Sequence, residues 1–226
     1  MQITKVSARV RDTSEAAEFF EDVLLLTVDR KVASGPTTIE VRIGTTLLEL
    51  TEDPDTVGQH HLAITIPSNT FAAARQWLEP RSALIGTPDA DEFEFTAWNA
   101  RSLYFTGPDR SVLKFIIRRD LDNDTRGAFT SADLLCVSEV GVATDDVLAT
   151  AEFLKTEADV RPYAGESGRS FAPVGDAEGL LILVTPGRPW FPTANRGASP
   201  DPIVVEATGP RPGEYPLGAG SLLRIR

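Results

Sequence analysis

Two adjacent histidines, His60 and His61, open the strand-like run HHLAITIP, and the chain has no others. Because side chains alternate across a strand, adjacent residues point to opposite faces. At most one of the two can therefore enter a given pocket, as a hydrogen-bonded anchor, an acid–base group or a metal ligand. Any metal site built here must draw its other ligands from carboxylates.

Charged residues interrupt other apolar runs. Glu49 stands inside TTLLELTE, Lys114 inside SVLKFIIR, and Lys5 alternates with apolar residues in ITKVSARV. In HHLAITI, the apolar alternate positions share a face with His60, which leaves His61 on the other face. We therefore expect Lys5, Glu49, His61 and Lys114 to point away from the packed side of their strands.

An arginine lies among aromatic residues in the run WNARSLY, which contains Trp98, Arg101 and Tyr104. Alternation places Arg101 on one face with Leu103 and Phe105, and Tyr104 on the opposite face. An aromatic wall with one arginine suits a flat anionic ligand. The plainer interpretation is ordinary core with a surface arginine, and both remain open.

The segments that must position these residues repeat one order. The first unit has a strand at 3–10, a helix at 12–26 and a hairpin at 38–52 around Gly44. The second has a strand at 60–66, a helix from Ser68 or Asn69 to Leu78, and three strands in EFEFTAW, RSLYFT and VLKFIIR. Two βαβββ units therefore follow each other.

The rest of the chain looks like a shortened repeat. Residues 121–133 are polar and resemble a connection. The run LLCVSEVGVA then predicts a strand, Asp145 to Leu154 a helix, and RSFAPV and GLLILVTP further strands. From Pro202 onward we expect two strands at most, in PIVVEAT and SLLRIR.

This order resembles the vicinal oxygen chelate superfamily, which includes glyoxalase I, bleomycin resistance proteins and extradiol ring-cleavage dioxygenases. The likeness is carried by VSARVRDTSEAAEFFEDVLLL and HHLAITIPSNTFAAARQWL as module openings, by YFTGPDRSVLKFIIR as a closing turn and strand, and by SEVGVATDDVLATAEFL with GLLILVTPGRPWFPT as a third module. It implies an α+β fold in which tandem βαβββ modules form curved mixed sheets around a cleft, with helices outside. It also implies a glyoxalase-like domain of paired modules at 1–120, a linker at 121–133, and a second, incomplete glyoxalase-like domain at 134–226.

The resemblance further implies four ligand positions, on the first and last strands of each paired module. In the N-terminal pair these positions hold Lys5, Glu49, His61 and Lys114. Only His61 and Glu49 could bind a divalent cation, because a lysine ammonium has no lone pair. A catalytic metal site typically has three protein ligands. We therefore expect no tightly bound metal, with His61 and Glu49 as weak candidates and iron, manganese or zinc as the alternative cofactor.

Two interpretations of the lysines remain. Lys5 and Glu49 could form a structural ion pair, or an ammonium could replace the metal as a positive centre that binds a carboxylate or an enolate-like oxygen. In the third module, the corresponding positions are Glu139 and Ile182. A proline- and aromatic-rich run, GRPWFPT at 187–193, could close an apolar interface or cover a pocket.

The composition restricts the classes of molecule that the protein could bind. The net charge is −11, and both halves are acidic, which argues against nucleic acid and anionic membranes. The single cysteine, Cys136, fits a reducing cytoplasm, and the N-terminal run lacks the apolar core of a signal peptide. We therefore expect a cytoplasmic protein with a small-molecule ligand, and a homodimer stays open.

The expected function is small-molecule binding. We expect a superfamily protein with a degenerate metal site whose cleft, formed by Lys5, Glu49, His61, Arg101 and Lys114, binds a small aromatic or anionic ligand. The alternative is a metal-dependent extradiol-type dioxygenase, isomerase or lyase. Extradiol chemistry needs two histidines and a carboxylate, a set that one usable histidine does not supply.

Overall fold

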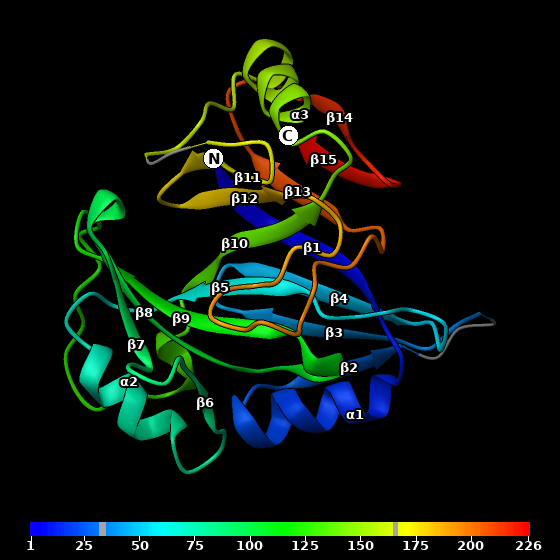
Figure 1. Cartoon of the computed structure of the whole chain (residues 1–226). Helices are drawn as coiled ribbons and strands as arrows, with labels where there is room; N and C mark the ends of the chain where they lie inside the picture. Colours follow the sequence, from blue (N-terminus) through cyan, green and yellow to red (C-terminus); the bar gives the residue numbers. More distant parts are fainter. Residues whose placement is uncertain (32–34, 165–166) are drawn as a thin grey trace.

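Two mixed sheets with helices outside make up the protein (Figure 1). The computed structural model describes residues 1–31, 35–164 and 167–226. The expected α+β fold of curved mixed sheets is confirmed. In the described part of the chain, no helix is long and apolar enough to cross a membrane.

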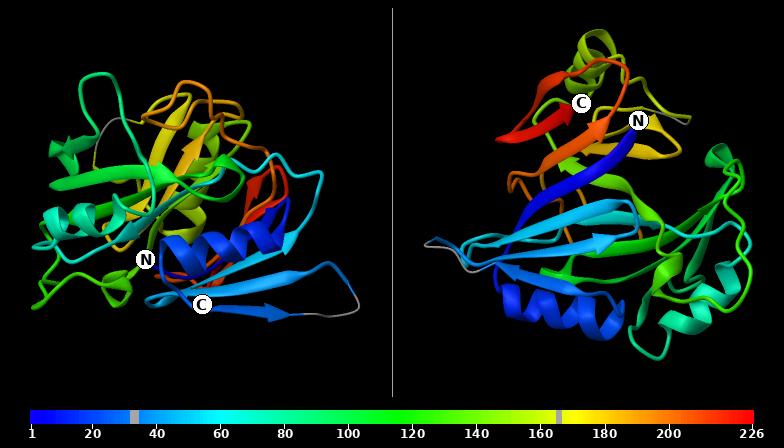
Figure 2. Two further views of the ribbon diagram at one scale, coloured as in Figure 1. Left: turned by 90° about the horizontal axis from the view of Figure 1, so that it is seen from below. Right: turned by 180° about the vertical axis from the view of Figure 1, so that it is seen from behind.

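The first sheet, called sheet A here, joins the start of the chain to its end. Its order is β14 (Gly213–Gly218), β15 (Ser221–Ile225), β13 (Val204–Thr208), β1 (Gln2–Val10), β4 (Thr46–Glu52), β3 (Thr38–Ile43) and β2 (Val28–Lys31). Strand β1 runs antiparallel to β13 and parallel to β4. Figure 2 shows β1, in dark blue, beside the orange β13.

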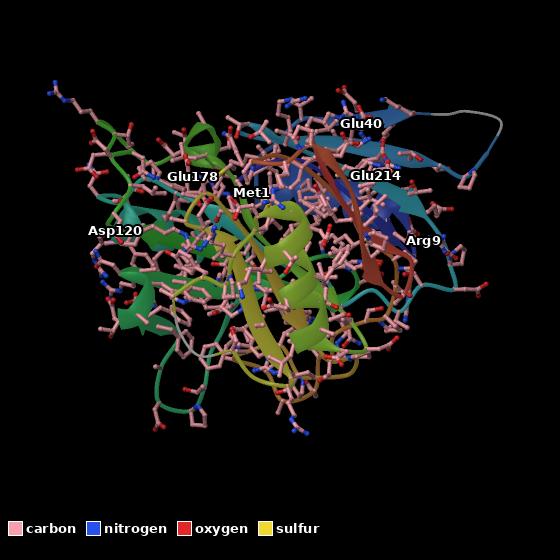
Figure 3. The ribbon with its side chains drawn as sticks, turned by 90° about the horizontal axis from the view of Figure 1, so that it is seen from above. Met1, Arg9, Glu40, Asp120, Glu178 and Glu214 are labelled. Carbon is pink, nitrogen blue, oxygen red and sulfur yellow. The ribbon has the colours of Figure 1, made fainter. Side chains whose placement is uncertain are left out.

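The second sheet, sheet B, is built from the middle of the chain. Its order is β11 (Phe171–Asp176), β12 (Gly179–Val184), β10 (Cys136–Ala143), β5 (His61–Thr65), β9 (Val112–Arg118), β8 (Ala100–Thr106) and β6 (Leu84–Ile85), and β7 (Glu92–Phe95) also pairs with β8. Strand β5 is antiparallel to β10 and parallel to β9. In Figure 3, Asp120, just after β9, lies on the left of the view, whereas Arg9, Glu40 and Glu214 of sheet A lie on the right.

The helices cover the apolar faces of the sheets. Helix α1 (Thr13–Glu18) continues as the π-helical turn η1 (Phe19–Val23) and packs on β3 and β4. The Asp12 carboxylate caps it by accepting from the amides of Ser14 and Glu15. Helix α2 (Phe71–Leu78) contacts β9, while α3 (Val147–Phe153), with its π-helical turn η5 (Leu154–Ala158), contacts β11 and β12.

The strand pairing joins the modules in a different way from the expectation that the two N-terminal modules pair with each other. The first module pairs with the last segment through β1 and β13, and the second pairs with the third through β5 and β10. The opening strand of each unit has one edge that no strand of the same unit pairs with. The alternation of side chains within that strand does not specify which other opening strand pairs with this edge. The division into 1–120, 121–133 and 134–226 stays a prediction about folding units.

The last segment also departs from expectation. It forms three strands, β13, β14 and β15, where at most two were expected. Strand β14 contains Pro216 and two glycines, which hide its strand character in the sequence. It lies at the edge of sheet A, the position at which a proline is tolerated in a sheet.

Candidate functional site

A buried ion pair lies in the middle of sheet B. Lys114 in β9 and Glu139 in β10 are both register partners of Ala63, which lies between them in β5. The small Ala63 side chain leaves room for the pair to close above it. Lys114 Nζ lies 2.7 Å from Glu139 Oε2, and the two side chains are 3% and 1% exposed.

A second cation and a histidine complete the surroundings of Glu139. Arg118 Nη2 donates to Glu139 Oε1 at 2.6 Å, from a side chain with no exposed surface. His61 Nε2 lies 3.8 Å from Glu139 Oε2, which is too far for a hydrogen bond. Glu139 Oε2 accepts no well-aligned hydrogen bond from the described residues, so its contact with Lys114 is ionic.

Burial and the neighbouring charges have opposing effects on the pKa of each member of this pair. Burial alone would raise the pKa of Glu139, but the attraction of Lys114, together with His61 and Arg118, outweighs it and lowers that pKa. Burial lowers the pKa of Lys114, which the attraction of Glu139 only partly offsets. Glu139 therefore stays ionised, whereas Lys114 loses its proton more readily than an exposed lysine does.

The orientation of His61 follows from its other ring nitrogen. His61 Nδ1 lies 2.8 Å from the carbonyl oxygen of Val112. Because a carbonyl only accepts, Nδ1 carries a proton, and in the neutral ring Nε2 then keeps its lone pair. It is Nε2 that faces Glu139, so the backbone of β9 fixes which side of the imidazole is available.

Three of these residues, His61, Lys114 and Glu139, lie at one end of a cavity of ≈ 230 Å³. Its walls are mostly aromatic. The lining residues are His61, Phe95, Trp98, Tyr104, Lys114, Glu139, Phe171, Ile182, Arg188, Trp190 and Phe191. Lys114 Nζ lies 5.2 Å from the ring centre of Phe95 and 5.6 Å from those of Trp98 and Tyr104, within reach of cation–π attraction.

The segment after β12 closes the cavity from another side. Trp190 Nε1 donates to the carbonyl oxygen of Gln59 at 2.7 Å, and its ring centre lies 5.2 Å from that of His61. Phe191 is 45% exposed, yet its ring centre is 5.6 Å from that of Tyr104. The run 187–193 thus contributes both a buried wall and an exposed rim to the cavity.

Arg188 adds a further positive charge. It lines the cavity, and its guanidinium lies 5.1 Å from the ring centre of Phe171. Within the described residues its guanidinium forms no ion pair, and the one hydrogen bond of that group, to the carbonyl oxygen of Pro189, is long at 3.5 Å. Burial lowers the pKa of Arg188, but an arginine remains charged at neutral pH.

The structure brings together two of the five expected cleft residues. His61 and Lys114 line the cavity. Lys5 and Glu49 instead pair with each other on sheet A, at 2.8 Å and with 26% of each side chain exposed. The expected convergence of all four therefore does not occur, because β1 belongs to sheet A and β5 to sheet B.

Arg101 also lies outside the cavity. Its guanidinium contacts Glu92, lies 3.5 Å from Glu94 and sits 4.5 Å from the ring centre of Phe71. In the β8–β9 register, Tyr104 is opposite Lys114, whereas Arg101 is opposite Ile117. Alternation thus separates Arg101 from the cavity face, as its shared face with Leu103 and Phe105 implies.

Glu139, Arg118 and Arg188 are charged residues of the site that the candidate set missed. Glu139 and Arg118 are charged residues in largely apolar strands, the same signal that identified Lys114, and Arg188 lies in the proline- and aromatic-rich run 187–193. Glu139 and Ile182, the two positions noted in the third module, line the cavity together with His61 and Lys114. The missing information was the pairing of the second module with the third.

The residues present do not fit a divalent cation. The ammonium of Lys114 occupies the space beside Glu139 where a cation would bind that carboxylate. His61 and Glu139 alone supply two donors, one fewer than a typical catalytic site. Among residues 1–31, 35–164 and 167–226, no three His, Cys, Asp or Glu side chains gather as a metal-binding group.

Comparison with solved structures places the fold among known proteins. A Bacillus subtilis protein assigned as a dioxygenase matches all of this chain and 84% of its own, with a TM-score of 0.66 and 16% identity. Glyoxalase I of Zea mays matches 99% of this chain and 91% of its own, with a TM-score of 0.60 and 13% identity. A point mutant of the same maize enzyme matches 99% and 92%, with a TM-score of 0.61 and 12% identity.

These similarities establish the fold, which this chain shares with maize glyoxalase I and the Bacillus subtilis protein. No protein-family model matches the sequence, and no curated protein matches it either. The chemistry of this chain must therefore be argued from its own residues.

Proposed function

We propose that the cavity in sheet B binds a small aromatic carboxylate, with charged protein groups in place of a metal. The observation that carries the proposal is the balance of charge. Two cationic side chains, Lys114 and Arg188, and one carboxylate, Glu139, line the cavity, and a third cation, the buried Arg118, contacts that carboxylate. With a neutral His61, this leaves a net positive charge inside an acidic protein.

The cations divide into two groups. Lys114 and Arg118 already contact Glu139, whereas Arg188 forms no ion pair within the described residues. A ligand carboxylate is therefore expected at Arg188, whose planar fork suits bidentate contact. The aromatic walls, including Phe171 and Trp190, would then hold the ligand's ring.

Tyr104 supports the orientation of the ligand. Burial, together with the negative charge of Glu139, raises the pKa of the Tyr104 hydroxyl, so the phenol keeps its proton. It can then donate a hydrogen bond to an oxygen of the ligand. A site with aromatic walls and a few polar groups matches the usual composition of small-molecule pockets.

Calorimetry with benzoate and its uncharged analogue benzamide tests the proposal. We expect benzoate to bind and benzamide to bind more weakly. Replacement Arg188→Met should weaken benzoate binding roughly tenfold or more, since a charged hydrogen bond contributes about 1.5–3 kcal/mol. The matched control is Arg9→Met, which removes an exposed arginine of sheet A that pairs with Asp53. Equal binding of the two probes, or no effect of Arg188→Met, would contradict the proposal.

The fold similarity supplies the alternative, a metal-dependent dioxygenase, isomerase or lyase. That function would require the Lys114 ammonium to leave the side of Glu139. Metal analysis of protein purified without a histidine tag tests it. Stoichiometric iron, manganese or zinc that is lost in His61→Ala would favour the alternative.

A further inference from the structure

Lys114 is the one lysine of this chain that lines the cavity. The sequence has four lysines, and the other three are Lys5, Lys31 and Lys155. Their side chains are 26%, 57% and 46% exposed, compared with 3% for Lys114. The Lys114 amine therefore meets the cavity rather than bulk solvent, between the aromatic rings of Phe95, Trp98 and Tyr104.

Such surroundings favour amine chemistry. A lysine in an apolar pocket is a stronger nucleophile at neutral pH, because burial favours its uncharged form. Burial does lower the pKa of Lys114. Arg118 shares Glu139 with Lys114 by holding the other carboxylate oxygen, so Glu139 keeps a cationic partner when Lys114 gives up a proton.

We propose that Lys114 captures aldehydes or ketones in this cavity by forming an imine with the ligand's carbonyl carbon. The proposal rests on the aromatic carboxylate site and names its ligand class more narrowly, as an aromatic carboxylate that also bears a carbonyl group. Arg188 would hold the carboxylate while the carbonyl reaches Lys114.

The reaction needs no other reactant. The ammonium of Lys114 loses a proton, and its lone pair forms a C–N bond as the carbonyl π electrons move to oxygen. The oxygen takes up protons and leaves as water, and the C=N bond forms. Ammonium and carbonyl thus give iminium and water, with charge and atoms conserved. The iminium keeps a positive charge beside Glu139 at the place the ammonium occupied.

His61 is placed to move the proton. Its Nε2 and Lys114 Nζ both approach the same oxygen, Oε2 of Glu139, at 3.8 and 2.7 Å. Because Nδ1 donates to Val112, Nε2 is free to accept a proton and return it to the leaving oxygen. Glu139 is held as a carboxylate and keeps these groups together by charge.

Reductive trapping tests the imine. The protein is incubated with 4-formylbenzoate and sodium cyanoborohydride, digested, and each lysine peptide is measured by mass spectrometry. We expect Lys114 to gain the mass of the probe less one oxygen atom, and to do so faster than Lys5, its more exposed counterpart in a Lys–Glu pair. Labelling of Lys5, Lys31 and Lys155 with Lys114 unlabelled would overturn the proposal.

A variant and a second probe complete the test. Lys114→Arg keeps the charge but cannot form the imine, so we expect loss of the Lys114 label while Lys5 labelling continues. If this variant fails to fold, the comparison of Lys114 with Lys5 in the unaltered protein still decides. Uncharged benzaldehyde separates the two proposals. Label at Lys114 from benzaldehyde without any benzoate binding would support the imine and reject the carboxylate site, and benzoate binding without label would do the reverse.

Discussion

Lys114 and Glu139 form a buried ion pair at 2.7 Å across Ala63, whereas Lys5 and Glu49 form a partly exposed one at 2.8 Å on sheet A. The residue types are the same and the distances nearly so, but the burial differs. The partly exposed pair is a control that the chain itself provides. Differences between matched substitutions in the two pairs then report what burial adds.

Removal of the buried carboxylate should destabilise the fold strongly. In Glu139→Gln, Lys114 and Arg118 lose the carboxylate that both contact. Breaking a buried pair by removing one partner costs about 3–5 kcal/mol, because an uncompensated charge stays inside. Urea unfolding measures the loss. The control Glu49→Gln should cost about 1 kcal/mol or less, as for exposed pairs, and equal losses would contradict this account.

Acid should act on the same carboxylate. Glu139 has a lowered pKa in the folded protein, against its ordinary value of 4.5. Below that value, the unfolded chain binds the proton more readily than the folded one, so protonation favours unfolding. The contribution of Glu139 to stability is therefore complete above about pH 4.5 and is lost as the pH falls toward its folded-state pKa.

The free energy of unfolding, measured against pH, checks this sign. It should fall more steeply below pH 4.5 in the unaltered protein than in Glu139→Gln. A ¹³C NMR titration of the Glu139 carboxyl gives an independent reading. Parallel stability curves, together with an ordinary titration of that carboxyl, would show that the cations do not hold Glu139 ionised.

Local patterns in the sequence were sufficient to predict which residues share a face of a strand. Alternation separated His61 from His60 and placed Lys114 on the face opposite Leu113 and Phe115. The order of strands and helices was sufficient for the fold, which the comparisons confirm. These inferences succeed because they depend on residues close together in the chain.

The partner of each module could not be predicted in the same way. Strand β5 meets β10, which lies more than seventy residues further along the chain. The opening strands of the third and last segments are both apolar, and either could complete an open edge. Glu139 therefore stayed outside the candidate set until its register partner, Ala63, was known.

Gly141 should be intolerant of a side chain. A Cβ at this position would lie 2.5 Å from Cη2 of Trp190 and 3.0 Å from Cβ of His61. Trp190 cannot move freely, because its Nε1 donates to Gln59. Gly141→Ala should therefore cost about 1–3 kcal/mol, as overpacking does, and weaken benzoate binding by shifting a wall of the cavity.

Thermal unfolding and tryptophan fluorescence measure these effects. The emission change should become much smaller when Trp190→Phe is added, because Trp190 is the tryptophan that the new Cβ meets. Gly168→Ala is the control, since a Cβ there meets no atom of the described residues within 4 Å. A Gly141→Ala protein as stable as this control would mean that Trp190 packs elsewhere in solution.

Replacement of the ammonium by a carboxylate should create affinity for a divalent cation. Lys114→Glu would place a second carboxylate beside Glu139 and His61, which gives three donors at one end of the cavity. It also removes the positive charge that repels a metal. We expect the unaltered protein to bind Mn²⁺ or Zn²⁺ weakly and Lys114→Glu to bind either more tightly, while benzoate binding weakens. Calorimetry on untagged protein measures both ligands. Lys5→Glu is the matched control, because it places a carboxylate beside Glu49 without a cavity histidine. A metal affinity that rises equally in both variants, or in neither, would show that the ammonium of Lys114 is not what bars the cation.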